Sequence, residues 1–222
     1  MTVNIFLVVL AAEEFRYFEV MFILYIRRKN YLFRLLTMAE SQSLCAVMKA
    51  ANFAAIKHTN QRRKDAAETP YINHPLGVAN ILIQEGNVHD PDVIVAALLH
   101  DTVEDTDTTF EEIEMNFGSK VRKIVVEVTD DKNLPKQERK LLQIKHSPHI
   151  SHEAKLVKLA DKIYNLRDLL KATPVGWTSE RVEEYFEWSK AVIAGCRGSN
   201  LPLETAVDSI FAEYAKRSLE IS

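Results

Sequence analysis

The chain has 222 residues, of which 47% are apolar, and its formal net charge is -3 at pH 7. This length and composition suit one substantial hydrophobic core, so we expect a single domain. The small acidic excess argues against a protein whose whole surface binds nucleic acid, because that function normally requires a basic surface.

Residues 1–37 differ in composition from the rest, so we treat them as an N-terminal extension and expect the domain over residues 38–222. The extension has two apolar runs, Val3 to Ala12 and Val20 to Ile26, each well short of the roughly 20 residues that cross a bilayer. It lacks the cationic start and the cleavage site of a secretory signal. An extra helix packed on the domain, or a start upstream of the native one, explains the segment most simply. Any membrane contact is expected only through this segment and the basic cluster that follows its apolar runs.

The two cysteines, Cys45 and Cys196, both lie in apolar helical contexts. We therefore expect buried thiols rather than a disulfide framework, which fits a reducing compartment. The expected location is cytoplasmic.

From Ser43 onward the apolar residues recur at helical spacing and hairpin signals are missing, so an all-α fold is predicted. The clearest helix follows Asp90, a good N-cap, with Pro91 at its first position. Its residues from Val93 to Leu99 are apolar all round, which predicts a buried, central helix.

A second helix is expected to begin near Thr108 or Thr109, with a capping box, and to stop at Phe117. The segment Val121 to Thr129 is rich in β-branched residues, but its apolar residues also fit positions i, i+3, i+4 and i+7, and we predict a helix. Residues 130–151 are predicted to form a polar excursion that could be the rim of a site.

That excursion is expected to hold at most a short helix near Lys136 to Ile144. A long helix is predicted from about Ser151 to Ala172, because Pro174 disfavours helix in the residue before it. Two more helices are expected, over about Glu180 to Ala194 and Leu203 to Ser218.

Three separated segments supply side chains that can bind a divalent metal ion: His74, the adjacent His100 and Asp101, and Asp161. Each segment alone is a weak signal. The pair is stronger, since it ends an apolar run in which a carboxylate is costly unless a positive group accompanies it. A bound divalent cation would be that group.

Glu104 and Asp105 follow the pair by four residues and therefore share its helix face. Such a cluster of like charges favours catalysis over a solvated helix end. A metal ion lowers the pKa of bound water, and the two carboxylates are predicted to orient and deprotonate that water. Asn165, four residues after Asp161, could hold a sugar hydroxyl or a phosphate oxygen, although an ordinary exposed asparagine explains it nearly as well.

The basic cluster Arg62, Arg63 and Lys64 lies about ten residues before the first predicted ligand and could bind a polyphosphate, or could be a solvated surface patch. The remaining histidines have no carboxylate neighbour in a comparably apolar setting. We place them outside the metal site: His58, His89, His146, His149 and His152.

The segments RRKDAAETPYINHP, AALLHDTVEDTDTTFEEIEMNFG and AKLVKLADKIYNLRDL, in this order, resemble the HD-domain hydrolases of the RelA/SpoT family. The resemblance is closest to the small stand-alone animal members, the metazoan SpoT homologues. The HD pair alone would indicate only the superfamily, whereas the ED pair, YINHP and KLADKIYNLRDL narrow it to this family.

The resemblance implies a single HD-domain bundle of about ten helices, one Mn²⁺ per chain and hydrolysis of guanosine 3′,5′-bis(diphosphate) to GDP and pyrophosphate. It implies that the metal ligands are His74, His100, Asp101 and Asp161. It implies that the catalytic carboxylates are Glu104 and Asp105. It also implies substrate contacts by Arg63, Lys64, Lys136, Asn165, Arg181 and Tyr185. The chain has no room for the synthetase and regulatory domains of long bacterial members, which implies a pure hydrolase.

The chain departs from the family where Glu68 and Thr69 replace the usual glycine beside the Pro-Tyr turn, a change expected to stiffen or reshape that loop. Other functions stay open: a phosphatase acting on another nucleotide such as NADPH, a nucleotide-binding sensor without catalysis, or a membrane-attached scaffold resting only on residues 1–37. The residues themselves suit manganese, iron, cobalt or zinc, so manganese follows from the resemblance alone.

Overall fold

The computed structural model describes residues 28–29 and 41–221. The prediction of an extension over residues 1–37 therefore lies, apart from two residues, outside the described part of the chain. The chain divides into two units, Met1–Cys45 and Ala46–Ser222, and the fold below is that of the second unit. None of the described helices is both long enough and apolar enough to span a membrane.

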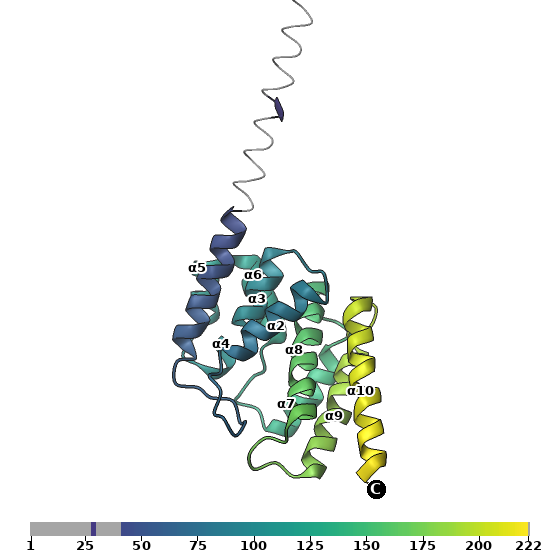
Figure 1. Ribbon diagram of the computed structural model, residues 1–222. Coiled ribbons are helices and arrows are strands. Elements are labelled where there is room, and N and C mark those ends of the chain that lie inside the picture. Colours follow the sequence, from purple (N-terminus) through teal and green to yellow (C-terminus); the bar gives the residue numbers. More distant parts are fainter. Residues whose placement is uncertain (1–27, 30–40, 222) are drawn as a thin grey trace, which may run out of the picture. The chain divides into compact units, whose positions relative to one another are not determined.

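The prediction of an all-α fold is confirmed (Figure 1). In the described residues, a helix over residues 41–57 is followed by nine further helices, and the only β-type pairing is an isolated bridge between Arg62 and Pro70. The further helices are α2 (Asn73–Gln84), α3 (Pro91–Leu99), α4 (Thr102–Asp105), α5 (Phe110–Phe117), α6 (Ser119–Val128), α7 (Lys136–His146), α8 (His152–Lys171), α9 (Ser179–Ala194) and α10 (Leu201–Ile221).

The central helix is α3, as its apolar sequence predicts. The Asp90 carboxylate caps it by accepting a hydrogen bond of 2.9 Å from the Asp92 amide, and every residue from Val93 to Leu99 is buried. It packs against α2, α6 and α8. Each large aliphatic side chain so buried contributes about 1.5–3 kcal/mol, so this helix anchors the fold.

Local signals also fixed α5 and α6. The Thr109 hydroxyl accepts from the Glu112 amide at 3.2 Å and caps α5, which ends at Phe117. The ambiguous segment after it is helical, with Val121, Ile124 and Val125 buried. The prediction of a helix there is confirmed.

Three expectations need correction. The segment after α3 is not one continuous helix, because His100 and Asp101 separate α3 from the short α4, although both residues keep αR backbone angles. Helices α7 and α10 each extend beyond the bounds expected from the sequence. Cys196 is buried as expected, but Cys45 is exposed.

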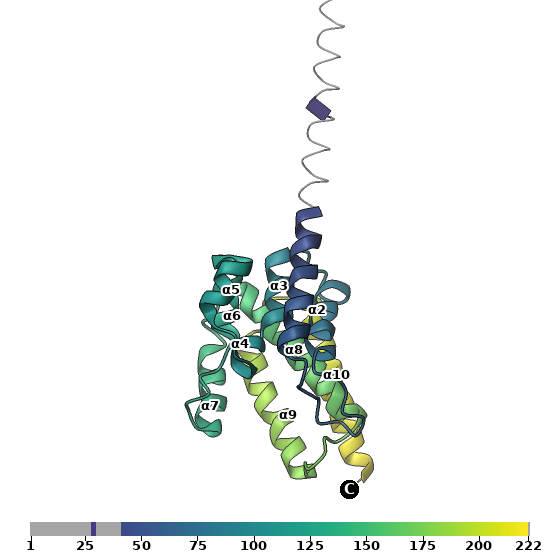
Figure 2. The same ribbon diagram turned by 90° about the vertical axis from the view of Figure 1, so that its left-hand side faces the viewer.

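Close contact between α2 and α8 depends on Gly77. A Cβ atom there would lie 2.0 Å from the ring of Tyr164 in α8, so only glycine allows this approach. The same ring packs edge-on against His74, with centroids 4.9 Å apart. In both views α7 and α9 lie below α3 and α4 (Figures 1 and 2). The predicted metal ligands lie on α2, on the α3–α4 junction and on α8.

Candidate functional site

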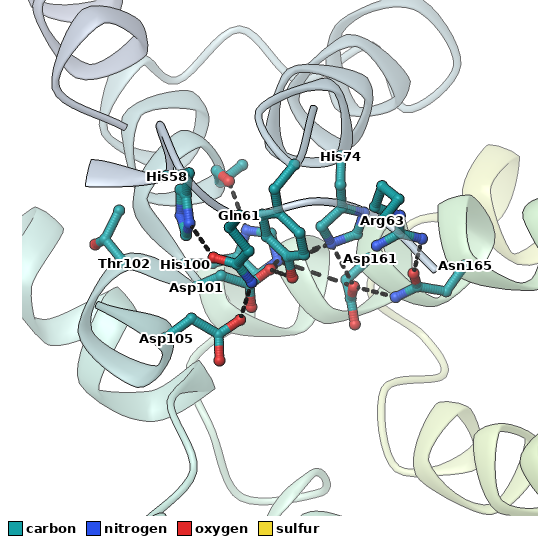
Figure 3. Close-up of polar contacts among 12 residues, drawn as sticks. His58, Gln61, Arg63, His74, His100, Asp101, Thr102, Asp105, Asp161 and Asn165 are labelled. Atoms are coloured by element: carbon teal, nitrogen blue, oxygen red, sulfur yellow. Dashed lines mark hydrogen bonds and ion pairs between the residues drawn. The ribbon is translucent and has the colours of Figure 1, made fainter. Parts of the chain in front are cut away.

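The four predicted metal ligands come together (Figure 3). The Nε2 atom of His74 lies 3.2 Å from Nε2 of His100, 3.4 Å from Oδ2 of Asp101 and 3.2 Å from Oδ1 of Asp161. His100 Nε2 lies 3.0 Å from Asp101 and 3.9 Å from Asp161. His74 Nε2 thus lies within 3.4 Å of a nitrogen or oxygen atom of each of the other three predicted ligands, and three of the four, His74, His100 and Asp101, are spaced as a group that could hold a metal ion.

The four distances of 3.0–3.4 Å fit a shared cation, whereas the 3.9 Å between His100 and Asp161 is longer. Donor atoms about 2.1 Å from one metal ion lie roughly 3.0–3.4 Å apart at octahedral or tetrahedral angles. His100 Nδ1 donates a 2.7 Å hydrogen bond to the Ala97 carbonyl, which leaves its Nε2 lone pair free to bind a metal ion. Tyr71 donates through its hydroxyl to Asp101 at 2.7 Å and fixes that carboxylate.

The charges of the Asp101 and Asp161 carboxylates also favour a positive charge within the cluster. Burial opposes ionisation of Asp161, but the adjacent Lys162 ammonium and the two histidines hold the pKa of this carboxyl below its ordinary value. Burial alone would lower the pKa of His100, yet the Asp101 and Asp161 carboxylates raise it to about 9. The two carboxylates therefore favour a positive charge at this point of the cluster.

The four predicted ligands line a cavity of about 170 Å³, which we call the metal cavity. Glu104 lies on its wall. Its carboxylate accepts hydrogen bonds from the Asp130 amide at 3.2 Å and from Arg139 at 3.3 Å. Burial, followed by the charge of Asp130, raises the pKa of Glu104 to about 7. A carboxyl group with that pKa can both accept and return a proton near neutral pH.

The Asp105 carboxylate has other partners than the Glu104 carboxylate. It accepts a hydrogen bond from the Gln61 side chain at 2.9 Å (Figure 3), and it also forms an ion pair with Lys132. Gln61 is held in turn by His58, whose Nδ1 lies 2.7 Å from it. Asp105 is not among the residues that line the metal cavity, so the structure brings one of the two predicted catalytic carboxylates to the cavity wall.

Asn165 is partly buried and bridges two groups. It donates to Asp161 at 2.6 Å and accepts from Arg63 at 2.8 Å, while Arg63 also pairs with Asp168 at 3.1 Å. The interpretation of Asn165 as an exposed surface residue is therefore wrong. It joins Arg63 to a predicted metal ligand, and both residues line the metal cavity.

The other predicted substrate residues gather at a larger neighbouring cavity of about 730 Å³, lined by Lys64, Lys136, Arg181 and Tyr185. Trp177 also lines it, with the Arg181 guanidinium 4.2 Å from the centre of its ring. Cationic and aromatic side chains together suit a phosphorylated nucleotide. Glu68 lies in the loop before the Pro-Tyr turn and has a φ of 49°. This left-handed conformation favours glycine, so the glutamate is strained at this departure from the family.

The sequence missed several residues of these walls. They are Tyr71, Arg139, Lys140, Lys158, Lys162, Trp177 and Trp188. Lys158 and Lys162 carried a usable signal, since they stand in an apolar helical stretch and a lysine is almost never fully buried unless it is paired. Arg62 turns away and bonds to the Thr59 and Gln61 carbonyls, so it belongs to the surface.

The fold and the His-Asp cluster together define an HD-domain protein, and a family model described as HD domain matches residues 50–184. The guanosine-3′,5′-bis(diphosphate) 3′-pyrophosphohydrolase MESH1 of Xenopus tropicalis is 62% identical over 173 residues, covering 78% of this chain and 97% of the relative. The Homo sapiens protein of the same name is 59% identical over 167 residues, covering 75% of this chain and 93% of the relative.

A solved structure is also similar, that of a metazoan ortholog of SpoT described as hydrolyzing ppGpp and playing a role in starvation responses. It shares 53% identity and a TM-score of 0.75, and the match covers 76% of this chain and 95% of that chain. The chain belongs to the HD-domain family and, within it, to the family of these MESH1 proteins.

Proposed function

We propose that the protein is a metal-dependent hydrolase that converts guanosine 3′,5′-bis(diphosphate) to GDP and pyrophosphate. The 62% identity to a relative named for this activity carries the proposal. It is also supported by the cavity that His74, His100, Asp101 and Asp161 all line, in which the first three are spaced as a group that could hold a metal ion.

We assign the metal site to His74, His100, Asp101 and Asp161. A divalent cation bound there would lower the pKa of a coordinated water toward neutrality and so supply the nucleophile near pH 7. Tyr71 and Asn165 hold the two carboxylates in place through their hydrogen bonds. Manganese is our proposed cation, and its identity rests on the family resemblance.

Glu104 accepts the proton of the attacking water in this proposal. The pKa of about 7 places the group near equal ionisation at neutral pH, so that it can return the proton to the ribose 3′-oxygen as that oxygen leaves phosphorus. Asp105 keeps the catalytic role that the resemblance implies, although its carboxylate bonds to Gln61 and Lys132 and does not line the cavity.

We place the nucleotide in the larger cavity, where Lys64, Lys136 and Arg181 meet its phosphates and Tyr185 its base or sugar. Arg63 lines both the metal cavity and a third hollow beside Lys64, and so joins the two parts of the substrate site. A cytoplasmic location belongs to the same proposal, supported by two cysteines that form no disulfide.

Incubation of the manganese-loaded protein with guanosine tetraphosphate, followed by separation of the products, tests this function. GDP and pyrophosphate should appear in equal amounts. The same assay with NADPH measures the main alternative, because kcat/KM ratios compare how well each transition state is bound. A larger kcat/KM for NADPH, or no release of pyrophosphate, would overturn the substrate assignment.

A further inference from the structure

Three cationic side chains other than histidine line the metal cavity: Arg63, Lys158 and Lys162. Two of them have close partners. Arg63 pairs with Asp168 at 3.1 Å, and Lys162 pairs with Asp161 at 3.0 Å while its ammonium lies 4.3 Å from the centre of the Trp188 ring. Their charges are therefore already balanced within the protein.

Lys158 is different. Its side chain is buried, with 7% of the residue exposed, and within the described part of the chain no carboxylate oxygen lies within 4.0 Å of its ammonium. Its one hydrogen bond there is a long contact of 3.5 Å to the Val128 carbonyl at the end of α6. Burial, and then the neighbouring Lys162 ammonium, lower the pKa of Lys158 by more than the charges of Asp130 and Asp161 raise it, as expected for an ammonium group without a counter-ion in direct contact.

A buried ammonium without a close partner is costly, and replacing such a group by an apolar one commonly stabilises a protein. Lys158 nevertheless stands one helical turn before Asp161 and on the same face of α8. The cavity that it shares with the predicted ligands and Glu104 therefore has a positive charge available for an anion.

We propose that Lys158 binds the 3′-diphosphate of the substrate and stays on it as it becomes the pyrophosphate product. This inference rests on the proposed function. In that reaction, water adds to the phosphorus attached to the ribose 3′-oxygen, the bond between them breaks, the oxygen takes a proton and pyrophosphate leaves. Lys158 makes no covalent bond and stabilises the negative charge on the non-bridging oxygens.

Lys158→Met tests the proposal, with Lys155→Met, a partly exposed lysine on the same helix, as the matched control. Calorimetric titration of the manganese-loaded proteins with inorganic pyrophosphate should show affinity at least about tenfold weaker for Lys158→Met, the scale of one charge-assisted hydrogen bond. The kcat/KM for guanosine tetraphosphate should fall by a similar factor or more. Metal content is measured on the same samples after titration.

If Lys158 served only to stabilise the fold, Lys158→Met would lower the melting temperature. The proposal predicts otherwise. Lys158→Met should keep or raise the melting temperature of the protein without pyrophosphate, because an unbalanced buried charge is removed. Lys158→Arg, which retains the charge, should recover part of the pyrophosphate affinity and serves as the second variant if Lys158→Met does not fold.

Unchanged pyrophosphate affinity in Lys158→Met at full metal content would overturn the proposal, as would a loss equal to that of Lys155→Met. The proposed function fails separately: wild-type protein that binds pyrophosphate through Lys158 but does not hydrolyse guanosine tetraphosphate would retain this anion site and lose the reaction.

Discussion

Among the residues that line the metal cavity, Glu104 has the most specific proposed role, that of general base. Its carboxylate lines the cavity but forms hydrogen bonds with Asp130 and Arg139 rather than with the predicted ligands. Glu104→Gln should therefore keep its metal ion and lose turnover by a factor of about a hundred or more, the scale of a positioned general base. Metal analysis and single-turnover rates on the same sample separate the two effects.

Glu112→Gln is a suitable control, since Glu112 is paired with Lys57 outside the cavity. It should leave both quantities unchanged. Loss of metal from Glu104→Gln, with a normal chemical step in the remaining holoenzyme, would make Glu104 a ligand instead of a base.

The raised pKa of Glu104 leads to a prediction about pH. A base must be ionised, so kcat/KM should fall as the pH drops through the pKa of this group, which burial and then Asp130 raise to about 7. Asp130→Asn removes a neighbouring negative charge while keeping the amide that bonds to Glu104. The acidic limb of the pH profile should move toward lower pH.

A bound cation lowers the pKa of Glu104 in the variant and the wild type alike, so the difference between the two profiles isolates the effect of Asp130. Asp131→Asn is the matched control, because Asp131 is exposed and its side chain bonds within its own turn to Asn133. An acidic limb that is the same in all three proteins would exclude Glu104 as the group that titrates.

For the helices, the sequence predicted those boundaries that are set by neighbouring residues, such as N-caps, and missed the others. Caps at Asp90 and Thr109 set the starts of α3 and α5, and both were predicted. The break at His100 was not, since its backbone angles remain helical and nothing in the residue types marks it. The predicted ligand set, whose members now line one cavity, came from residue chemistry, whereas the hydrogen bond from the Tyr71 hydroxyl to Asp101 depends on how a distant loop folds back.

The close contact between α2 and α8 predicts that replacing a helical glycine by alanine destabilises the protein instead of stabilising it. Alanine normally favours a helix over glycine by about 1 kcal/mol. At Gly77, however, the new Cβ would lie 2.0 Å from the Tyr164 ring. Gly77→Ala should therefore lower the free energy of unfolding by about 1–3 kcal/mol, as overpacking does, measured by urea denaturation.

Because α2 carries His74 and α8 carries Asp161, the same variant should also bind its metal ion more weakly. Gly77→Ala combined with Tyr164→Leu gives the new methyl group room and should recover part of both losses. A single Gly77→Ala variant more stable than wild type would show that the two helices can separate without cost.

At the scale of the whole molecule, the predicted ligands link three parts of the chain: the start of α2, the α3–α4 junction and the middle of α8. An unfolded chain cannot hold these segments at one point, so the cation binds mainly the folded state. Binding then stabilises the fold by about 2.7 kcal/mol when free metal is a hundredfold above its Kd.

For a domain of this size, that free energy corresponds to a rise in Tm of roughly 5–10 °C. Differential scanning calorimetry of protein stripped with a chelator and then titrated with manganese measures the rise. His100→Ala and Asp101→Ala should each remove most of it, because each deletes a donor atom of the group that could hold the metal ion. His149→Ala changes an exposed histidine and should retain the full rise. Equal rises in all of these proteins would place the stabilising cation elsewhere, since neither variant of the cluster could then be binding it.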